Sequence, residues 1–281
     1  MGIAFVVYTL TPQTVGETAR RHVLQVFQEH YPEHVVSLRR GYFDKNVGFI
    51  FEDLRILDPL AVIDGAQDSE LVRIERLTVE ADLDTGKLGS GGLPLNTHRI
   101  LLDGVHVNTR LLSDGTPSIS ELLPMPEFGP VAPRMEIRGL RLHLVDADSR
   151  SRPMIATFPE VLVVRARNAQ GTTDDSITLR GSTDFANSLV VQVNTSSQGV
   201  DIRGMVKGAY LSRDLFDRLP PQWRKAVREV RDLQCICDAS FAVHKPTAGN
   251  LDYAARVQSL VGMTISESEQ RKTLTALGFR L

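Results

Sequence analysis

The sequence is poor in cysteine, in aromatic residues and in net charge, and each shortage excludes a class of protein. Cys235 and Cys237 are the only cysteines among its 281 residues. A disulfide across so short a loop would be strained, and two ligands are too few for a metal site, so both are interpreted as free thiols. The formal net charge is −2 and no basic run with interleaved aromatics occurs, which argues against binding to nucleic acid. Aromatic residues make up only 6% of the chain, so its sheet faces are expected to be lined by Val, Leu and Ile.

The apolar run at residues 2–10 is too short to cross a bilayer, which takes about 20 residues in a helix. It also lacks the flanking features of a signal peptide. Two interpretations remain open: a buried leading segment, or the distal end of a membrane helix whose beginning lies outside this chain. Thr11 and Pro12 then mark the start of a helix, and Pro32 predicts its end near His30. We therefore divide the chain into an N-terminal helical segment, residues 1–34, which includes the candidate truncated anchor, and a β domain, residues 35–281.

The chain repeats a phrase of two alternating apolar residues, two middle residues and two more alternating apolar residues in the opposite register. The copies are Phe49-x-Phe51-x-x-Leu54-x-Ile56, Val72-x-Ile74-x-x-Leu77-x-Val79, Ile100-x-Leu102-x-x-Val105-x-Val107, Met135-x-Ile137-x-x-Leu140-x-Leu142 and Ala156-x-Phe158-x-x-Val161-x-Val163. Spacing of two is typical of strands, and a slip of one residue sends the following side chains to the other face unless a β-bulge absorbs it.

The middle pairs of the phrase are where bulges are predicted. They are Glu52-Asp53, Glu75-Arg76, Asp103-Gly104, Arg138-Gly139 and Pro159-Glu160, and looser copies place Gly181 and Gly204 in the same position. Glycine suits a bulge because it adopts positive φ at little cost. Ordinary alternating strands joined by turns are the alternative interpretation. The bulged version predicts that Leu54 and Ile56 share a face with Phe49 and Phe51, and not with Ile50.

The predicted fold class is mainly β, a curved and bulged antiparallel sheet in the form of a groove or scoop, with an N-terminal helix. Turn signals between the strands favour a meander order. A short helical insertion is predicted near residues 212–233, where Ser212 and the pair Pro220-Pro221 mark two helix starts. Strands are expected to resume at Ile236 and at Leu251.

No pattern in the sequence predicts an active site. Gly89-Ser90-Gly91-Gly92 lacks the lysine and Ser/Thr of a phosphate-binding loop. The acidic pairs, such as Asp146 with Asp148, lie at turns where aspartate serves the backbone, so a carbohydrate-active enzyme is the weakest candidate. We expect no enzyme activity, no cofactor and no metal.

Three segments together resemble the N-terminal region of bacterial AsmA-like proteins, which are relatives of the chorein-type, bridge-like lipid-transfer proteins. The segments are Val47 to Ile56, with a leading glycine and then Asp53-Leu54; Arg110 to Pro124; and Pro133 to Asp146. The resemblance implies a scoop-shaped sheet behind an N-terminal membrane anchor, with an apolar inner face that accommodates lipid acyl chains. It leaves open that this chain is a fragment of a longer protein.

The expected function is that of a non-enzymatic, envelope-associated lipid-binding or lipid-transfer module. The alternative is a structural or interaction module whose apolar face packs on a partner or on a C-terminal continuation. The expected partners are lipid or a membrane surface and other envelope proteins. The resemblance implies a bacterial cell-envelope location, anchored in the inner membrane and facing the periplasm. The candidate lipid-groove residues are Phe49, Phe51, Leu54, Ile56, Leu77, Val79, Val105, Val107, Leu140 and Leu142.

Overall fold

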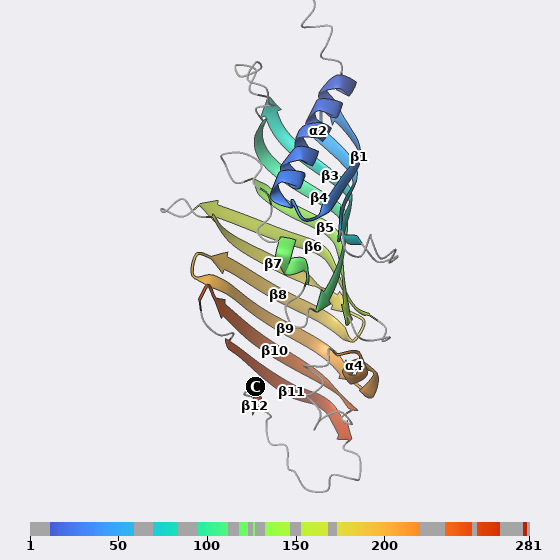
Figure 1. Cartoon of the computed structure of the whole chain (residues 1–281). Helices are drawn as coiled ribbons and strands as arrows, with labels where there is room; N and C mark the ends of the chain where they lie inside the picture. Colours follow the sequence, from blue (N-terminus) through green and yellow to red (C-terminus); the bar gives the residue numbers. More distant parts are fainter. Residues whose placement is uncertain are drawn as a thin grey trace, which may run out of the picture. The chain divides into compact units, whose positions relative to one another are not determined.

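The protein is described by a computed structural model that covers residues 12–58, 70–83, 95–111, 118–122, 126, 133–146, 153–167, 173–219, 234–248, 252–264 and 278–279. The elements in chain order are α2 (Pro12–His30), β1 (Val35–Asp44), β2 (Gly48–Leu57), β3 (Glu70–Leu83), β4 (Leu95–Leu111), the 3₁₀ helix η2 (Ser118–Leu122), β5 (Arg134–Asp146), β6 (Met154–Arg167), β7 (Thr173–Thr183), β8 (Ala186–Ser196), β9 (Gly199–Leu211), α4 (Arg213–Arg218), β10 (Gln234–Pro246), β11 (Asp252–Thr264) and β12 (Gly278–Phe279). Figure 1 shows them coloured along the chain.

The fold is mainly β, as the sequence predicts: one open sheet in which each strand is hydrogen-bonded to its neighbour in the chain, from β1 to β12. The pairs whose register is defined are antiparallel. Short turns join β1 to β2, β7 to β8 and β8 to β9, since antiparallel strands can be joined by a tight turn and parallel strands cannot. The chain divides into two compact units: unit 1 comprises residues 1–108 and 119–140, and unit 2 comprises residues 109–118 and 141–281.

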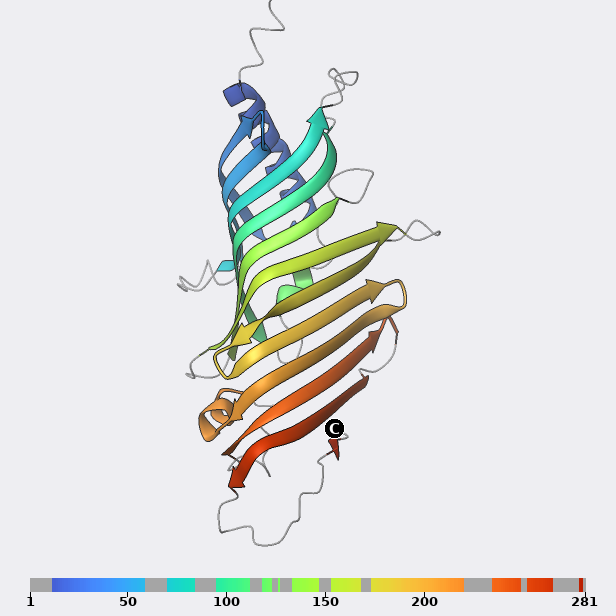
Figure 2. The same ribbon diagram turned by 180° about the vertical axis from the view of Figure 1, so that it is seen from behind.

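In unit 1, α2 packs against β1 and β2. It lies in front of these strands in Figure 1 and behind them in Figure 2. The helix begins at Pro12, as predicted, and its buried side chains recur every four residues, at Ala19, Val23 and Phe27. Glycine allows the close approach: a Cβ added at Gly16 would lie 2.5 Å from Tyr42 Cα. A larger side chain there would push the helix off the sheet.

The repeated phrase is confirmed as the plan of the strands in unit 1, because its copies pair with one another position by position. Phe49 lies opposite Val79, which in turn lies opposite Ile100, and Leu54 lies opposite Ile74, which lies opposite Val105. Both halves of the copies in β2 and β4 are buried, and so is most of the copy in β3, while the middle residues between the halves are more exposed. The alternation of buried residues therefore shifts by one position at the same level in these neighbouring strands. Ile50 is also buried, on the side opposite to Phe49 and Phe51.

The prediction of bulges at the middle pairs of β2, β3 and β4 is wrong, because the register is the same on both sides of these positions. Pairing stops for one residue on each strand and then resumes with the same offset, so no strand carries an extra residue there. The residues that interrupt the pairing lie opposite one another and define what we call the irregular row: Arg39, Asp53, Glu75 and Gly104. Asp53 and Gly104 adopt left-handed φ values of 59° and 63°, and Gly139 in β5 has a φ of 68°. Left-handed backbone at Asp53 and Gly104, in alternate strands of the row, thus accompanies the shifted alternation without a bulge.

Register shifts with an extra residue occur elsewhere in both units, in unit 1 at Leu71 and His98 and in unit 2 at a predicted position. Phe158 and Pro159 of β6 lie opposite the single residue Gly181 of β7, which confirms the predicted bulge beside Pro159-Glu160. A second bulge places Lys207 and Gly208 opposite Asp238. Gly208 has a φ of 60°, and its N–H donates to the Asp238 carboxylate at 2.8 Å.

Gly204 does not form the predicted bulge, because β9 keeps its register there with both neighbouring strands. The glycine is needed for another reason. A Cβ at Gly204 would lie 2.0 Å from Cζ of Phe241, the residue directly opposite in β10. The Phe241 ring therefore covers the position that a side chain would otherwise take.

The predicted helical insertion is confirmed in its first part as α4, which Ser212 caps by accepting a hydrogen bond from the Leu215 N–H at 3.3 Å. Its second part, residues 220–233, lies outside the described residues, as does the apolar run at residues 2–10. Among the helices that are described, none is long and apolar enough to span a membrane.

Candidate functional site

The candidate lipid-groove residues predicted from the sequence lie mostly in the core of unit 1. Seven of them, Phe49, Phe51, Leu54, Ile56, Leu77, Val79 and Val105, are at most 4% exposed, and Val107 is 9% exposed. Leu140 and Leu142 are only partly buried. Eight of the ten predicted residues are therefore already in contact with other side chains of the protein, and a role for them in lipid binding stays a prediction.

The irregular row carries a compact charge cluster centred on Asp53. Its carboxylate accepts hydrogen bonds from Arg55 at 2.9 and 3.1 Å and from Arg73 at 3.0 Å, and Arg39 lies 3.9 Å away. The hydrogen bonds from Arg55, and next those from Arg73, hold the pKa of Asp53 below its usual value, although partial burial opposes them. Aspartate is also one of the residues that tolerate left-handed φ. The cluster thus holds the backbone in place at the irregular row. We interpret this as a structural role.

Unit 2 presents an apolar surface that the sequence analysis did not single out. It is formed by one side of β7 to β10, and we call it the apolar face; its side chains are Ile177, Leu179, Leu189, Val191, Val193, Ile202, Val206, Phe241 and Val243. All of them are partly exposed, in contrast to the core of unit 1. The sequence signal for this face is the alternation in 189–193 and 202–206, which is the same as that of a buried strand.

The apolar face consists of cross-strand rows, because directly paired residues of antiparallel strands lie on the same side of a sheet. One row runs Ile177, Val193, Ile202, Val243, and the next runs Leu179, Val191, Gly204, Phe241. A third row runs Gly181, Leu189, Val206, Ala239. No polar side chain interrupts these rows. On the opposite side the same strands carry exposed residues of both kinds: Arg180, Gln192 and Arg203, and also Val190 and Met205.

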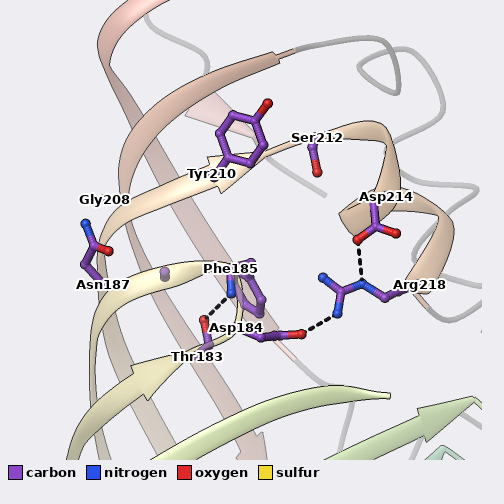
Figure 3. Close-up of a pocket in the computed structure, with 10 residues that line it drawn as sticks. Thr183, Asp184, Phe185, Asn187, Gly208, Tyr210, Ser212, Asp214 and Arg218 are labelled. Atoms are coloured by element: carbon purple, nitrogen blue, oxygen red, sulfur yellow. Dashed lines mark hydrogen bonds and ion pairs between the residues drawn. The ribbon is translucent and has the colours of Figure 1, made fainter. Parts of the chain in front are cut away.

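A polar pocket of about 480 Å³ lies in the same unit, at the α4 end of β9. Its lining residues come from the β7–β8 turn, from the end of β9 and from α4: Thr183, Asp184, Phe185, Ala186, Asn187, Gly208, Tyr210, Ser212, Asp214 and Arg218. Figure 3 shows Arg218 between Asp184 and Asp214, with Tyr210 and Asn187 apart from this charged group. The volume suits a small molecule or the head group of a larger one.

Arg218 organises the charged side of the pocket. Its guanidinium is paired with the Asp184 carboxylate and lies 3.2 Å from the Asp214 carboxylate, and its side chain is only 8% exposed. The Asp184 backbone is fixed in turn, since its N–H donates to the Ile155 carbonyl at 3.1 Å. The sequence analysis missed this pocket because Asp184 and α4 are about thirty residues apart, and no motif connects them.

The two cysteines and the other possible metal ligands show no sign of a metal centre in the described part of the chain. Cys235 and Cys237 are buried free thiols, as predicted, within a cluster that includes Ala186 and Ala209. Burial raises the pKa of Cys237 to about 11. No group of three or more His, Cys, Asp or Glu residues is arranged to hold a metal ion among these described residues.

Neither the protein-family models nor the curated proteins with which the chain was compared gave a match. The resemblance to AsmA-like proteins therefore stays a prediction that rests on the three quoted segments.

Proposed function

We propose that this chain is a non-enzymatic lipid-binding or lipid-transfer module of the bacterial cell envelope, and that lipid contacts it on the apolar face of unit 2. The observation that carries the proposal is the set of uninterrupted apolar rows across β7 to β10, whose side chains are partly exposed. Hydrocarbon needs only such a surface, because it has no polar groups to pair. The resemblance to AsmA-like proteins supports the same proposal and supplies its cell-envelope and inner-membrane part.

The dimensions of the rows suit an acyl chain. Neighbouring strands lie about 4.8 Å apart, so a row that crosses from β7 to β10 is roughly 14 Å long. Each methylene group buried against it contributes about 0.8 kcal/mol. The candidate residues of unit 1 suit this role less well, since hydrocarbon could reach them only by displacing side chains that already fill the core.

Two consecutive valines of β8 provide a matched test. Val191 lies in the apolar face and Val190 lies on the opposite side of the same strand, where it is 36% exposed. We expect Val191→Lys to remove co-purifying lipid, measured by native mass spectrometry and by lipid extraction of the full chain. We expect Val190→Lys to retain it. The Val191→Thr and Val190→Thr pair repeats the comparison with smaller changes if lysine prevents folding. Equal lipid content in the paired variants, or a wild-type chain without lipid, would contradict the proposal.

The second candidate is a structural or interaction module in which the same face packs on a protein partner. It is favoured by the edge at β11, where β12 pairs only with Ala255 and Arg256 in the described part of the chain. A strand from a partner would extend the sheet and its apolar rows there. Light scattering over a range of concentrations separates the two candidates. Association that Val191→Lys abolishes, without any bound lipid, would favour the second.

A further inference from the structure

The side of unit 2 opposite to the apolar face carries cations in the middle of the sheet. We call them the basic patch: Arg180 of β7, Arg203 and Lys207 of β9, and Arg256 of β11, all of which are exposed. One cross-strand row of this side runs Arg180, Val190, Met205, Ser240, Arg256. Arg203 and Lys207 lie two residues before and after Met205, and alternate residues of a strand lie on the same side. The four cations therefore surround Met205.

The acids on this side of the sheet do not neutralise the basic patch. Among the described residues, none of its four cations has an ion-pair partner. Asp238 accepts a hydrogen bond from the Gly208 N–H at 2.8 Å, and Asp201 is paired with His244 at 2.9 Å. The other described acids lie at the margins: Glu160 on β6, opposite Arg180, and Asp174 and Asp252 at the end beside the β8–β9 turn. Positive charge is thus concentrated in the middle of this side.

Large apolar side chains lie among and around these cations and are exposed. Met205 and Val190, at the centre of the basic patch, are 49% and 36% exposed. Further exposed apolar residues of this side are Leu162 and Val164 of β6, and Tyr210 and Ile236, which are paired across β9 and β10. Binding to a membrane interface grows with the apolar area that enters it and with the attraction of cations to anionic head groups. This side of unit 2 offers both.

We infer that the basic patch docks the protein on a membrane surface that contains anionic phospholipid, with Met205 and Val190 entering the interface. The charge of such a surface complements the four cations, and its hydrocarbon boundary takes up the apolar side chains. An acidic protein segment or a nucleic acid would pair with the cations but would leave Met205 and Val190 without an apolar partner. The inference does not depend on the apolar face, because docking and lipid binding use opposite sides of the sheet.

Co-sedimentation of the full chain with vesicles tests the docking. Vesicles of phosphatidylcholine mixed with phosphatidylglycerol should bind the chain much more tightly than vesicles of phosphatidylcholine alone, and added salt should weaken this binding. Each cation near an anionic surface strengthens binding roughly fivefold, so Arg180→Gln combined with Arg203→Gln should weaken binding to the mixed vesicles by roughly 25-fold. Arg213→Gln combined with Lys245→Gln is the matched control. It removes the same charge from exposed positions outside the basic patch and should have little effect.

The apolar part is tested separately from the charge. Met205→Ser should weaken binding to the mixed vesicles several-fold, because the side chain no longer enters the interface. Val35→Ser on β1 is its control, since Val35 is 46% exposed but lies outside the basic patch, and this variant should bind like the wild type. Circular dichroism checks that each variant is folded. Lys207→Gln combined with Arg256→Gln removes the other two cations and replaces the first pair if that pair prevents folding.

Three results would overturn the inference: equal binding to both kinds of vesicle, full binding by the folded double variants, or full binding by Met205→Ser. Binding to polyglutamate or to duplex DNA, without binding to the mixed vesicles, would instead assign the cations to an acidic macromolecule. The proposed function fails separately. Val191→Lys lies on the apolar face and should leave vesicle binding unchanged. Vesicle binding that Val191→Lys alone abolishes would overturn the docking site, whereas docking by a chain that never retains lipid would contradict only the proposed function.

Discussion

The pairing of Gly204 with Phe241 makes a prediction whose sign depends on which background carries the mutation. In the wild-type chain, the Cβ of Gly204→Ala would lie 2.0, 2.2 and 2.7 Å from three atoms of the Phe241 ring. The ring must swing away from the sheet, and overpacking of this kind costs about 1 to 3 kcal/mol. Because the φ of Gly204 is not positive, the alanine backbone itself fits, and it recovers about 0.4 to 1 kcal/mol by restricting the unfolded chain. The expected net result is a destabilisation of up to about 2.6 kcal/mol.

Removal of the ring should reverse this effect. In a Phe241→Ala background, Gly204→Ala meets no ring and should be neutral or stabilising by up to about 1 kcal/mol. Gly181→Ala is the matched control, because its Cβ would lie 1.9 Å from the Thr157 carbonyl oxygen, which belongs to the backbone and cannot swing away. That variant should be destabilised equally in both backgrounds. Urea unfolding followed by circular dichroism measures all the free energies of the cycle. A Gly204→Ala cost that persists without the ring would refute the reasoning.

Two titratable groups allow further predictions. The pKa of Asp53 is lowered by Arg55 and Arg73, so its stabilising effect is present above pH about 4 and is lost as the pH falls toward its folded value. Asp53→Asn keeps a residue that tolerates left-handed φ. At neutral pH it should lower the free energy of unfolding, measured in urea, by about 1.5 to 3 kcal/mol. It should also make that free energy depend less on pH in the acid range. The pKa of Cys237 is raised to about 11, so its thiol should resist iodoacetamide at pH 8 in the folded chain and react with it in urea. The same shift predicts that the protein loses stability above pH about 9 as the pH rises toward 11. Rapid alkylation of the folded protein, or an unchanged acid limb in Asp53→Asn, would count against these assignments.

Local patterns predicted the elements because each reports on a single segment. The start of α2 follows from Pro12, and the strands of unit 1 follow from alternating apolar residues that the structure buries. The bulges could not be decided in the same way. A bulge in one strand and an interruption that neighbouring strands share leave the same two-residue interval in the sequence, and only the unchanged register on both sides of Asp53 distinguishes them.

Exposure could not be predicted from the strands either. Phe51 of β2 and Val191 of β8 occupy equivalent positions in alternating segments, yet the first is buried and the second is partly exposed. The pocket is harder still, because Asp184 and Arg218 meet only after β8 and β9 have folded between them. Their sequence neighbourhoods indicate only a turn and a helix end.

The lengths of the helices explain why the apolar surface of unit 2 remains accessible. A helix rises about 1.5 Å per residue, so α2, with 19 residues, is roughly 28 Å long. It can therefore lie along β1, which has 10 residues and a length of roughly 33 Å. In contrast, α4 has 6 residues and a length of roughly 9 Å.

The rows from β7 to β10 are roughly 14 Å across, and each strand of the apolar face is far longer than α4. Among the described residues of unit 2, α4 is the only helix, and it buries Leu215 and Phe216 at the end of β9. It cannot shield Val193 or Val243 as well. Strands with the same alternation thus form a core in unit 1 and a partly exposed apolar surface in unit 2.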